Sequence, residues 1–307
     1  MSEKTAKIFP FSAICGQNDL KLALMLCAVD AQIGGVLARG EKGTGKTTTV
    51  RAIGDMLSDS DLNFPVINLP IGATEDRVLG AVDLEKLINE KRQIVRSGLL
   101  EQADGGILYI DEVNLLDDYL TDILLDAAAA GEYMLERDGI SQKVKSRFRL
   151  VGTMNGEEGE LRPQLLDRFG LCVEIKSPDD PQTRRTVARR RMEFDSDPKG
   201  FCADFEKEQK KLRKKIIKAA ENLDNVAVGE EIFDKASEIA LSSGAEGMRA
   251  DILIVKAARA LAALEGKNET NADDVEKVAP FVLRHRAKTP ADEEKKTPKT
   301  PNLKTVT

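Results

Sequence analysis

Residues 40–47 are Gly40-Glu41-Lys42-Gly43-Thr44-Gly45-Lys46-Thr47, and they fit the pattern G-x-x-x-x-G-K-[ST] of a phosphate-binding P-loop. The three glycines let the backbone take conformations that a Cβ atom would forbid, so that successive amide N–H groups can point at one anion. Lys46 supplies a point charge for the β- and γ-phosphates, and the Thr47 hydroxyl can ligate Mg²⁺. The stretch therefore predicts a site for ATP and Mg²⁺.

The segments on either side of the P-loop are those that such a loop needs. Val36-Leu37-Ala38 is apolar and is typical of a short buried strand. The residues from Thr48 to Leu57 are expected to form a helix, whose N-terminal amides and dipole add to the anion site. A chance glycine-rich turn is the alternative, and a strand before it with a helix after it argues against that alternative.

The composition excludes several classes of protein. The chain of 307 residues has 46 Lys and Arg against 52 Asp and Glu, a formal net charge of -6. A general nucleic-acid binder normally carries a basic surface, so we do not expect nucleic acid as a partner, although a local basic patch stays open. No apolar run reaches the roughly 20 residues that span a bilayer, so we expect no membrane span.

The cysteines and the histidine point to a reducing compartment. The four cysteines form no C-x-x-C pair, and His285 is the only histidine. Zinc sites need clustered Cys and His, and disulfide frameworks belong to oxidising compartments. We therefore expect neither a zinc site nor a disulfide framework, and we expect a cytoplasmic protein.

The second strong pattern is an apolar strand, residues 105–110, that ends in Asp111 and Glu112. Asp111 is suited to hold Mg²⁺ or its water, and Glu112 is suited to orient and polarise the attacking water. The pair follows the P-loop by about sixty residues, and two neighbouring parallel strands would bring both motifs to one edge of a sheet. A strand followed by an acidic helix cap is the alternative.

Residues 148–155 are expected to form another strand, which ends in Asn155. Its amide could hydrogen-bond the attacking water or the γ-phosphate, or it could only shape the turn after the strand. A fifth strand is expected at 171–175. These strands and the helices between them predict an α/β fold, a P-loop parallel sheet with flanking helices.

Two arginines are further candidates. Arg168 lies between a helix end and the strand at 171–175, and it could reach the γ-phosphate of a neighbouring subunit if subunits form a ring. A local salt bridge with Asp167 is the alternative. Arg249 begins a helix and could bend back over the nucleotide from a small second domain. An exposed arginine without such a role is the alternative there.

The chain before the P-loop is expected to turn at residues 11–17 and then to form a helix from 18 to 31. Such a segment could lay Ile14 and Cys15 against an adenine ring. A plain core helix is the alternative.

Several elements are expected between the P-loop helix and the strand at 148–155. Residues 65–70 predict a strand, residues 76–98 a helix interrupted by a loop or hairpin, and residues 115–130 a long helix. Asp138-Gly139 predicts a hairpin over 132–144. This hairpin is either a loop that faces a substrate or partner, or a solvated protrusion.

The composition changes near Pro178, and from Thr183 onward every expected element is helical. The basic run Lys210–Lys215 is most simply a solvated helix face. We predict four regions: a loose N-terminus at 1–10, a nucleotide-binding domain at 11–178, a smaller all-helical lid domain at 179–287 and a disordered tail at 288–307.

The order of these motifs resembles that of the AAA+ ATPases. In that family an α/β nucleotide domain with a parallel sheet precedes a helical lid domain, and subunits assemble into rings. The resemblance implies that Asn155 is sensor 1, Arg168 the arginine finger and Arg249 sensor 2.

A closer resemblance is to the I subunits of magnesium chelatase. It is carried by Leu79–Asp83, Ser97–Leu100, Asp111–Leu116, Glu136–Gly139, Ala258–Gly266 and, over the longest run, Glu157–Leu171. It implies that residues 76–98 are a helix-2 insertion and that 132–148 are a presensor hairpin. The chain departs from that family in having Gly156 where a proline usually follows the sensor asparagine.

This resemblance implies an ATP-hydrolysing ring, expected to be hexameric, that works with two partners. One is a D subunit with an AAA+ part and an integrin-like metal-binding part, and the other is a large H subunit that binds porphyrin. Together they insert Mg²⁺ into protoporphyrin IX. Two other functions stay open: a MoxR-type chaperone ATPase that remodels a protein complex or assists metal-cofactor insertion, and a non-enzymatic module that binds nucleotide as a structural ligand.

Overall fold

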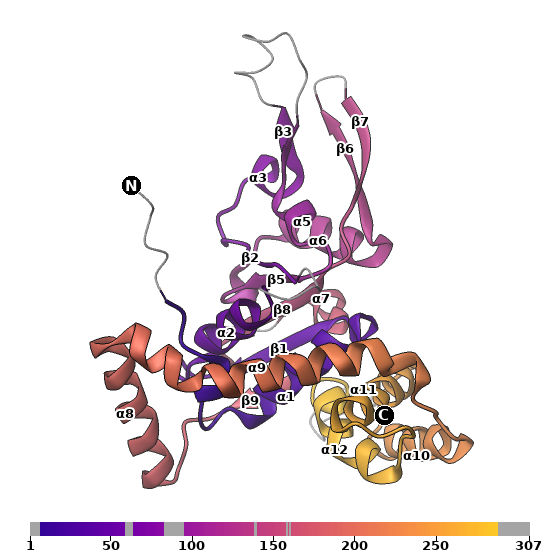
Figure 1. Cartoon of the computed structure of the whole chain (residues 1–307). Helices are drawn as coiled ribbons and strands as arrows, with labels where there is room; N and C mark the ends of the chain where they lie inside the picture. Colours follow the sequence, from indigo (N-terminus) through magenta and orange to yellow (C-terminus); the bar gives the residue numbers. More distant parts are fainter. Residues whose placement is uncertain are drawn as a thin grey trace, which may run out of the picture.

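A five-stranded parallel sheet forms the centre of the molecule in the computed structural model, which describes residues 7–58, 64–82, 95–137, 140–157, 159 and 161–287. Its strands lie in the order β2-β5-β8-β1-β9 (Figure 1). Their bounds are β1 Gly35–Gly40, β2 Val66–Asn68, β5 Ile107–Ile110, β8 Arg149–Met154 and β9 Leu171–Ile175. All of the pairs within this sheet are parallel, so the predicted α/β fold is confirmed.

The strand order corrects one expectation. We predicted that the P-loop strand and the strand before Asp111 are neighbours, but β8 lies between β1 and β5 and pairs with both. The carboxyl ends of all parallel strands still meet at one edge of a sheet. The residues that follow β1, β5 and β8 therefore share that edge, and Asn155 comes between the other two motifs.

The two faces of the sheet bury different side chains because successive residues of a strand point to opposite faces. Val36 and Ala38 pack in one cluster with α1 (Asn18–Val29) and α2 (Lys46–Ser58). Leu37 packs in the other cluster with α6 (Asp118–Ala130) and α7 (Pro163–Arg168). Helices thus cover both faces, which explains why the strands are almost wholly apolar.

Two helices differ from their expected bounds because of capping aspartates. The helix expected from residue 18 to 31 ends at Val29, since the Asp30 carboxylate accepts from the Gln32 amide and begins a short 3₁₀ turn, Ala31–Ile33. The helix expected from residue 115 begins at Asp118, since Asp117 accepts from the Leu120 amide. A 3₁₀ turn, Val113–Leu115, precedes it.

Two β-ribbons extend from one end of the nucleotide domain (Figure 1). The first follows α3 (Glu75–Leu79) and pairs β3 (Gly80–Val82) with β4 (Val95–Ser97); the second pairs β6 (Glu132–Arg137) with β7 (Ile140–Lys145). The Tyr133 hydroxyl donates to the Leu79 carbonyl at 2.7 Å, and this bond connects β6 of the second ribbon to the end of α3, which leads into the first. Within the predicted helix at 76–98 that a loop or hairpin interrupts, residues 83–94 lie outside the described residues, as does the turn at Asp138-Gly139.

The chain after β9 is helical through residue 287, as expected, apart from its connecting segments. It forms α8 (Pro181–Ser196), α9 (Pro198–Asn222), α10 (Glu230–Ser242), α11 (Arg249–Glu265) and α12 (Ala272–Leu283). Figure 1 shows α9 running from α8 on one side to the bundle of α10, α11 and α12 on the other. No helix in the described part of the chain combines the length and the apolar character needed to cross a bilayer.

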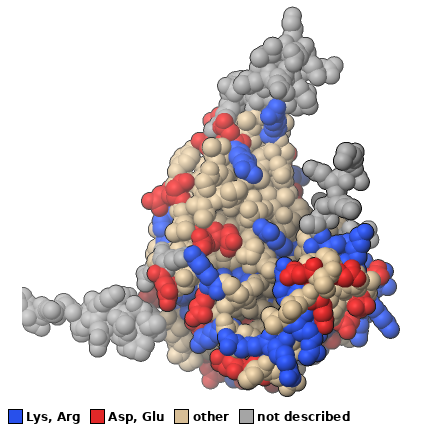
Figure 2. All heavy atoms as spheres, turned by 90° about the vertical axis from the view of Figure 1, so that its left-hand side faces the viewer, with Lys and Arg blue, Asp and Glu red and all other residues tan. Residues whose placement is uncertain are grey.

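Lysine and arginine gather over α8 and the adjoining part of α9 (Figure 2). Within the predicted basic run, Lys210, Lys211, Lys214 and Lys215 are exposed on α9, whereas Ile216 beside them is buried. The prediction of a solvated helix face is therefore confirmed for these four lysines.

Candidate active site

The P-loop connects β1 to α2 at the carboxyl edge of the sheet. Gly43 and Gly45 have φ values of 81° and 84°, and a Cβ at Gly40 would lie 2.1 Å from a carbonyl oxygen of β9, so glycine is needed at all three positions. The Lys46 ammonium donates to the carbonyl oxygens of Gly40 at 2.5 Å and Glu41 at 2.7 Å. Its charge therefore lies within the curve of the loop.

Three hydroxyl groups surround the Asp111 carboxylate at the same edge. Its oxygens lie 3.3 and 3.5 Å from Thr47 Oγ1. The Tyr109 hydroxyl lies 3.0 Å from both Thr47 Oγ1 and Asp111 Oδ1, and Thr153 donates to Asp111 Oδ1 at 2.5 Å. Magnesium in proteins prefers carboxylate, hydroxyl and phosphate oxygens, so these residues fit the predicted metal.

Burial keeps the Tyr109 phenol protonated. It raises the pKa of Tyr109 to about 12, against the opposing effect of the hydrogen bond to Thr47. At neutral pH the group is therefore a hydrogen-bond donor next to the carboxylate. Neither Tyr109 nor Thr153 was predicted from the sequence, since a tyrosine and a threonine within apolar strands carry no local sign of a polar role.

Glu112 has a strained backbone. Its φ of 55° is the only positive value at a non-glycine position among the described residues. Its amide donates to Thr153 Oγ1 at 3.1 Å, and its carboxylate lies 3.2 Å from the Lys42 ammonium of the P-loop. Strain of this kind persists where the surroundings fix it, as at active sites. The backbone conformation of Glu112 directs its carboxylate toward the P-loop.

Asn155 follows β8 and lines one cavity together with both motifs. This cavity has a volume of about 320 Å³, and its walls are residues 42–48, Asp111, Glu112 and the segment 153–155. Asn155 Oδ1 also accepts from the Glu157 amide at 3.4 Å, which is the turn-shaping contact of the alternative interpretation. The structure therefore brings Asn155 to the predicted site and gives it a local partner as well.

A second cavity of about 460 Å³ adjoins the first and shares Gly43, Thr44, Gly45 and Thr48 with it. Its other walls come from the segment 9–17, which includes Ile14 and Cys15, and from α8. Two joined cavities, one polar and one with apolar walls, suit the phosphates and the base of one nucleotide. Ile14 thus lies where the sequence analysis expected the adenine.

Two polar side chains fix the walls of this second cavity, and neither was predicted. Gln17 is buried, and its Nε2 donates to the Thr44 carbonyl at 2.6 Å, so it ties the N-terminal segment to the P-loop. Arg190 of α8 donates to the Ala13 carbonyl at 2.7 Å, and its Nη1 lies 2.8 Å from Cys15 Sγ. These contacts join residues far apart in sequence, which no local spacing reveals.

Arg168 lies away from these cavities and lines neither of them. It ends α7, and β9 begins at Leu171, which pairs with Val36 near the start of β1, whereas the P-loop follows Gly40 at the other end. Four strand residues span about 13 Å. Arg168 is half-buried, and within the described ranges its side chain has no hydrogen-bond or ion-pair partner.

Arg249 does not reach the nucleotide site of its own protomer in this structure, contrary to that expectation. Its Nη1 lies 2.9 Å from Asp167 Oδ2, and both side chains are about half exposed. Asp167 is also 3.8 Å from Arg286. The alternative for Arg168, a salt bridge with Asp167, is therefore not formed either, because two other arginines flank that carboxylate.

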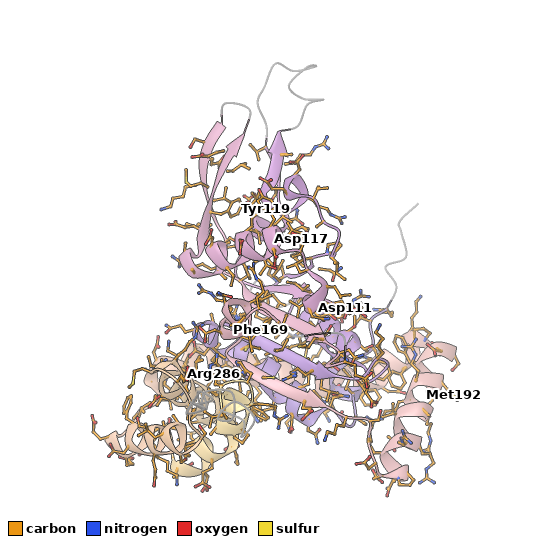
Figure 3. The ribbon with its side chains drawn as sticks, turned by 180° about the vertical axis from the view of Figure 1, so that it is seen from behind. Asp111, Asp117, Tyr119, Phe169, Met192 and Arg286 are labelled. Atoms are coloured by element: carbon orange, nitrogen blue, oxygen red, sulfur yellow. The ribbon has the colours of Figure 1, made fainter. Side chains whose placement is uncertain are left out.

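Figure 3 shows Arg286 beside the C-terminal helices, with Phe169 between it and Asp111 in this view. The predicted residues thus fall into two groups. Residues 42–48, Asp111, Glu112, Asn155 and Ile14 line the joined cavities, with Gly40 and Glu41 at the start of the same loop, whereas Arg249 pairs with Asp167, the residue before Arg168. One protomer therefore carries the candidate phosphate site and, apart from it, the two candidate arginines.

Comparison with known proteins gives matches over nearly the whole chain. The family model "AAA domain (dynein-related subfamily)" matches residues 35–169, and "AAA lid domain" matches residues 234–303. The magnesium-chelatase subunit ChlI of Cyanophora paradoxa is 44% identical, over 93% of this chain and 92% of its own length. The ChlI homolog of Methanocaldococcus jannaschii is 45% identical, over 91% and 85%.

Further matches come from a third relative and from solved structures. The magnesium-chelatase 38 kDa subunit of Rhodobacter capsulatus is 44% identical, over 94% of this chain and 91% of its own length. A cryo-EM-based structure of the complex between subunits BchI and BchD of magnesium chelatase aligns at 42% identity and a TM-score of 0.51, over 95% of this chain and 100% of the matched chain. A crystal structure of a candidate ATPase from Cytophaga hutchinsonii aligns at 17% identity and a TM-score of 0.67, over 93% and 87%, and supports the fold alone.

Proposed function

The chain belongs to the family of magnesium-chelatase I subunits, which are AAA+ ATPases, and we propose that it is the ATP-hydrolysing motor subunit of such a chelatase. It drives the insertion of Mg²⁺ into protoporphyrin IX together with D-type and H-type subunits. One observation carries the proposal: the P-loop, the Asp111–Glu112 pair and Asn155 line a single cavity.

Each group in that cavity has a task in ATP hydrolysis. The amides of residues 43–48 and the Lys46 ammonium bind the phosphates, while Thr47 and Asp111 hold Mg²⁺, which neutralises phosphate charge when bound. The Glu112 carboxylate accepts a hydrogen bond from the attacking water and polarises it. The Asn155 amide orients the water or the γ-phosphate. Hydrogen bonds from the Tyr109 and Thr153 hydroxyl groups fix the position of the Asp111 carboxylate.

The site is completed by a neighbouring subunit, in a ring that we take to be hexameric. The position of Arg168 supports this, since it is half-buried, free of described partners and remote from the P-loop of its own chain. Arg249 pairs with Asp167, the residue before Arg168, so we expect both arginines to act at the same interface between subunits. An arginine supplied in this way is worth about 10³ to 10⁵ in rate.

The partners follow from the family. The matched BchI structure is a complex with subunit BchD, which supports a D-type partner for this chain. Porphyrin would bind to the H-type subunit, and the contribution of this chain would be mechanical: ATP binding closes the interface between subunits and hydrolysis relaxes it. We place the protein in the cytoplasm, in keeping with its four free cysteines.

Two alternative functions have weaker support. A MoxR-type chaperone ATPase would share the same cavity, but the relatives that match over nine-tenths of the chain are chelatase subunits. A non-enzymatic nucleotide-binding module would not need an acidic pair held in place by Tyr109, Thr153 and the strained Glu112 backbone.

Reconstitution with the D- and H-type subunits of the same host tests the proposal. Protoporphyrin IX metallation is followed by fluorescence, with Glu112→Gln protein as the matched control. We expect ATP-dependent metallation with the wild-type chain and none with the variant. ATP hydrolysis by the complete set of subunits without any metallation would contradict the chelatase function and favour the chaperone.

A further inference from the structure

Arg286 follows α12 and packs against the α7–β9 connection that carries Arg168, with a side chain only 8% exposed. Its Nη1 donates to the carbonyl oxygens of Gly170 at 3.1 Å and Val282 at 2.9 Å. Its Nη2 donates to the carbonyl oxygens of Phe169 at 2.7 Å and Asp167 at 3.3 Å. One guanidinium thus joins the end of α12 to the backbone on both sides of Arg168.

His285 strengthens the same contact. Burial, and then the charge of Arg286, lowers the pKa of His285 to about 3, so the ring is neutral and its Nε2–H donates to the Phe169 carbonyl at 2.9 Å. Arg286 keeps its charge at neutral pH, although burial lowers its pKa to about 10. Consecutive residues of the C-terminal helical part therefore hold one carbonyl of the α7–β9 connection.

The connection has little freedom to move separately from these helices. The Phe169 ring is fully buried in the second cluster, and a Cβ at Gly152 of β8 would lie 2.9 Å from it. A lysine at position 286 could not reproduce the contact, because an ammonium is a point donor whereas the planar guanidinium spans several acceptors in fixed directions. The arrangement is specific to arginine.

From this geometry we propose that Arg286 is a positioning residue that couples the C-terminal helices to Arg168, and so sets where one subunit presents its arginine to the next. The inference rests on the proposed function, in which Arg168 acts on a neighbour. A displacement of α12 relative to the sheet is transmitted through the three carbonyl contacts to the backbone that carries Arg168. Arg286 touches no nucleotide and acts only through that backbone.

Arg286→Lys is the direct test, with Arg284→Lys as the matched control, since Arg284 is exposed and lies two residues before Arg286. In the full-length protein we expect kcat for ATP hydrolysis to fall about 10- to 100-fold in Arg286→Lys, since small misplacement of a catalytic group costs that much. Affinity for a fluorescent ATP analogue should stay within about twofold, because the P-loop lies at the other end of the strands. Arg284→Lys should match the wild type.

Mixed rings separate a positioning role from a general loss of structure. Arg286→Lys subunits mixed with Lys46→Ala subunits should regain part of the ATPase activity, because some of the intact P-loops then receive a correctly placed Arg168 from a Lys46→Ala neighbour. Arg286→Lys mixed with Arg168→Ala should not, because neither subunit presents a working arginine. His285→Ala, which loses one donor to the same carbonyl, should give the same pattern with a smaller loss, and it serves if Arg286→Lys does not fold.

The outcomes are distinguishable. Wild-type kcat in Arg286→Lys, or equal recovery in both mixtures, would overturn the positioning role while leaving the proposed function intact. No recovery when Arg168→Ala is mixed with Lys46→Ala, with rings still forming, would refute the trans arginine itself and the inference with it. Loss of nucleotide affinity in both Arg286→Lys and His285→Ala would make these residues structural supports only.

Discussion

Tyr109 lies between the two halves of the metal site, with its hydroxyl 3.0 Å from Thr47 and from Asp111. From the sequence it is one more large residue in the apolar run 107–110, as suitable for a buried strand as its neighbours. The roles of Lys46, Thr47, Asp111 and Glu112 could be predicted because each belongs to a local pattern with a known chemistry. The Tyr109 contact depends on β5 lying two strands away from β1, and no local sequence pattern predicts that strand order.

Tyr109→Phe should raise the Mg²⁺ concentration needed for half-maximal ATPase activity by about 3- to 10-fold, because loss of one buried hydrogen bond costs about 1 kcal/mol. Magnesium titration of ATP turnover measures this. Tyr119→Phe is the matched control, since the Tyr119 hydroxyl is exposed and bonds Glu75. An unchanged magnesium requirement in Tyr109→Phe would show that the hydroxyl does not support the metal ligands.

Glu112→Gln and Lys46→Ala should both abolish turnover but should differ in binding. Removal of a general base typically costs about 10² to 10⁴ in rate, while the phosphate contacts stay intact, so Glu112→Gln should still bind ATP. Lys46→Ala loses the charge that faces the phosphates and should bind weakly. Phosphate release and fluorescent-ATP titration measure the two properties, and near-normal turnover in both variants would refute the site.

At the scale of elements, the type of most described helices and strands followed from periodicity, whereas their ends were predicted less well. The helix expected from residue 115 begins three residues later because Asp117 caps it. The order of strands could not be predicted, since hydrophobic spacing defines a strand but not its neighbour. The walls that α8 contributes to the base cavity were missed for the same reason: a charged, mostly exposed helix gives no sign of what it faces.

Gly54 in α2 shows packing overriding helix propensity. Glycine to alanine inside a helix normally stabilises by about 1 kcal/mol, but a Cβ here would lie 2.3 Å from Val66 Cγ2 of β2. Overpacking costs about 1 to 3 kcal/mol, so Gly54→Ala should lower the free energy of unfolding in urea. In a Val66→Gly background, which removes both Val66 Cγ2 and the Val66 Cβ that would lie at 2.8 Å, the same change should be neutral or stabilising. Equal destabilisation in both backgrounds would mean that this contact is not the cause.

At the scale of the whole molecule, the functional residues lie at two separate places. The sequence analysis expected that Arg168 could reach the nucleotide of a neighbouring subunit and that Arg249 could bend back over the nucleotide from the small domain. The ion pair instead holds Arg249 at Asp167, the residue before Arg168, and sequence spacing alone cannot predict a pairing between residues 82 positions apart. The boundary at residue 178 between the two domains stays a prediction.

His285 makes the junction between these parts sensitive to acid. Burial lowers its pKa to about 3, with further lowering by Arg286, Arg39 and Arg249. Between that value and the unfolded pKa near 6.5, the unfolded chain binds one more proton than the native protein, so stability rises with pH across this window and is lost as pH falls. The contribution is up to about 2 kcal/mol between pH 6.5 and 5.

Urea unfolding of the wild type and of His285→Gln at pH 7 and pH 5 isolates this effect. The wild type should lose more stability than the variant on acidification, since the carboxylates of both proteins titrate alike. An identical loss in the two proteins would show that His285 is protonated as readily in the native state as in the unfolded one.

The central claim is that the P-loop of one subunit binds ATP, and that Arg168 of the next subunit assists the attack of water on its γ-phosphate. The most direct measurement is the ATPase rate of rings assembled from equal amounts of Arg168→Ala and Lys46→Ala subunits, each inactive alone. Intact P-loops then sit beside intact arginines at some interfaces, and we expect part of the wild-type rate to return. Assembled mixed rings that remain as inactive as either parent would contradict the claim.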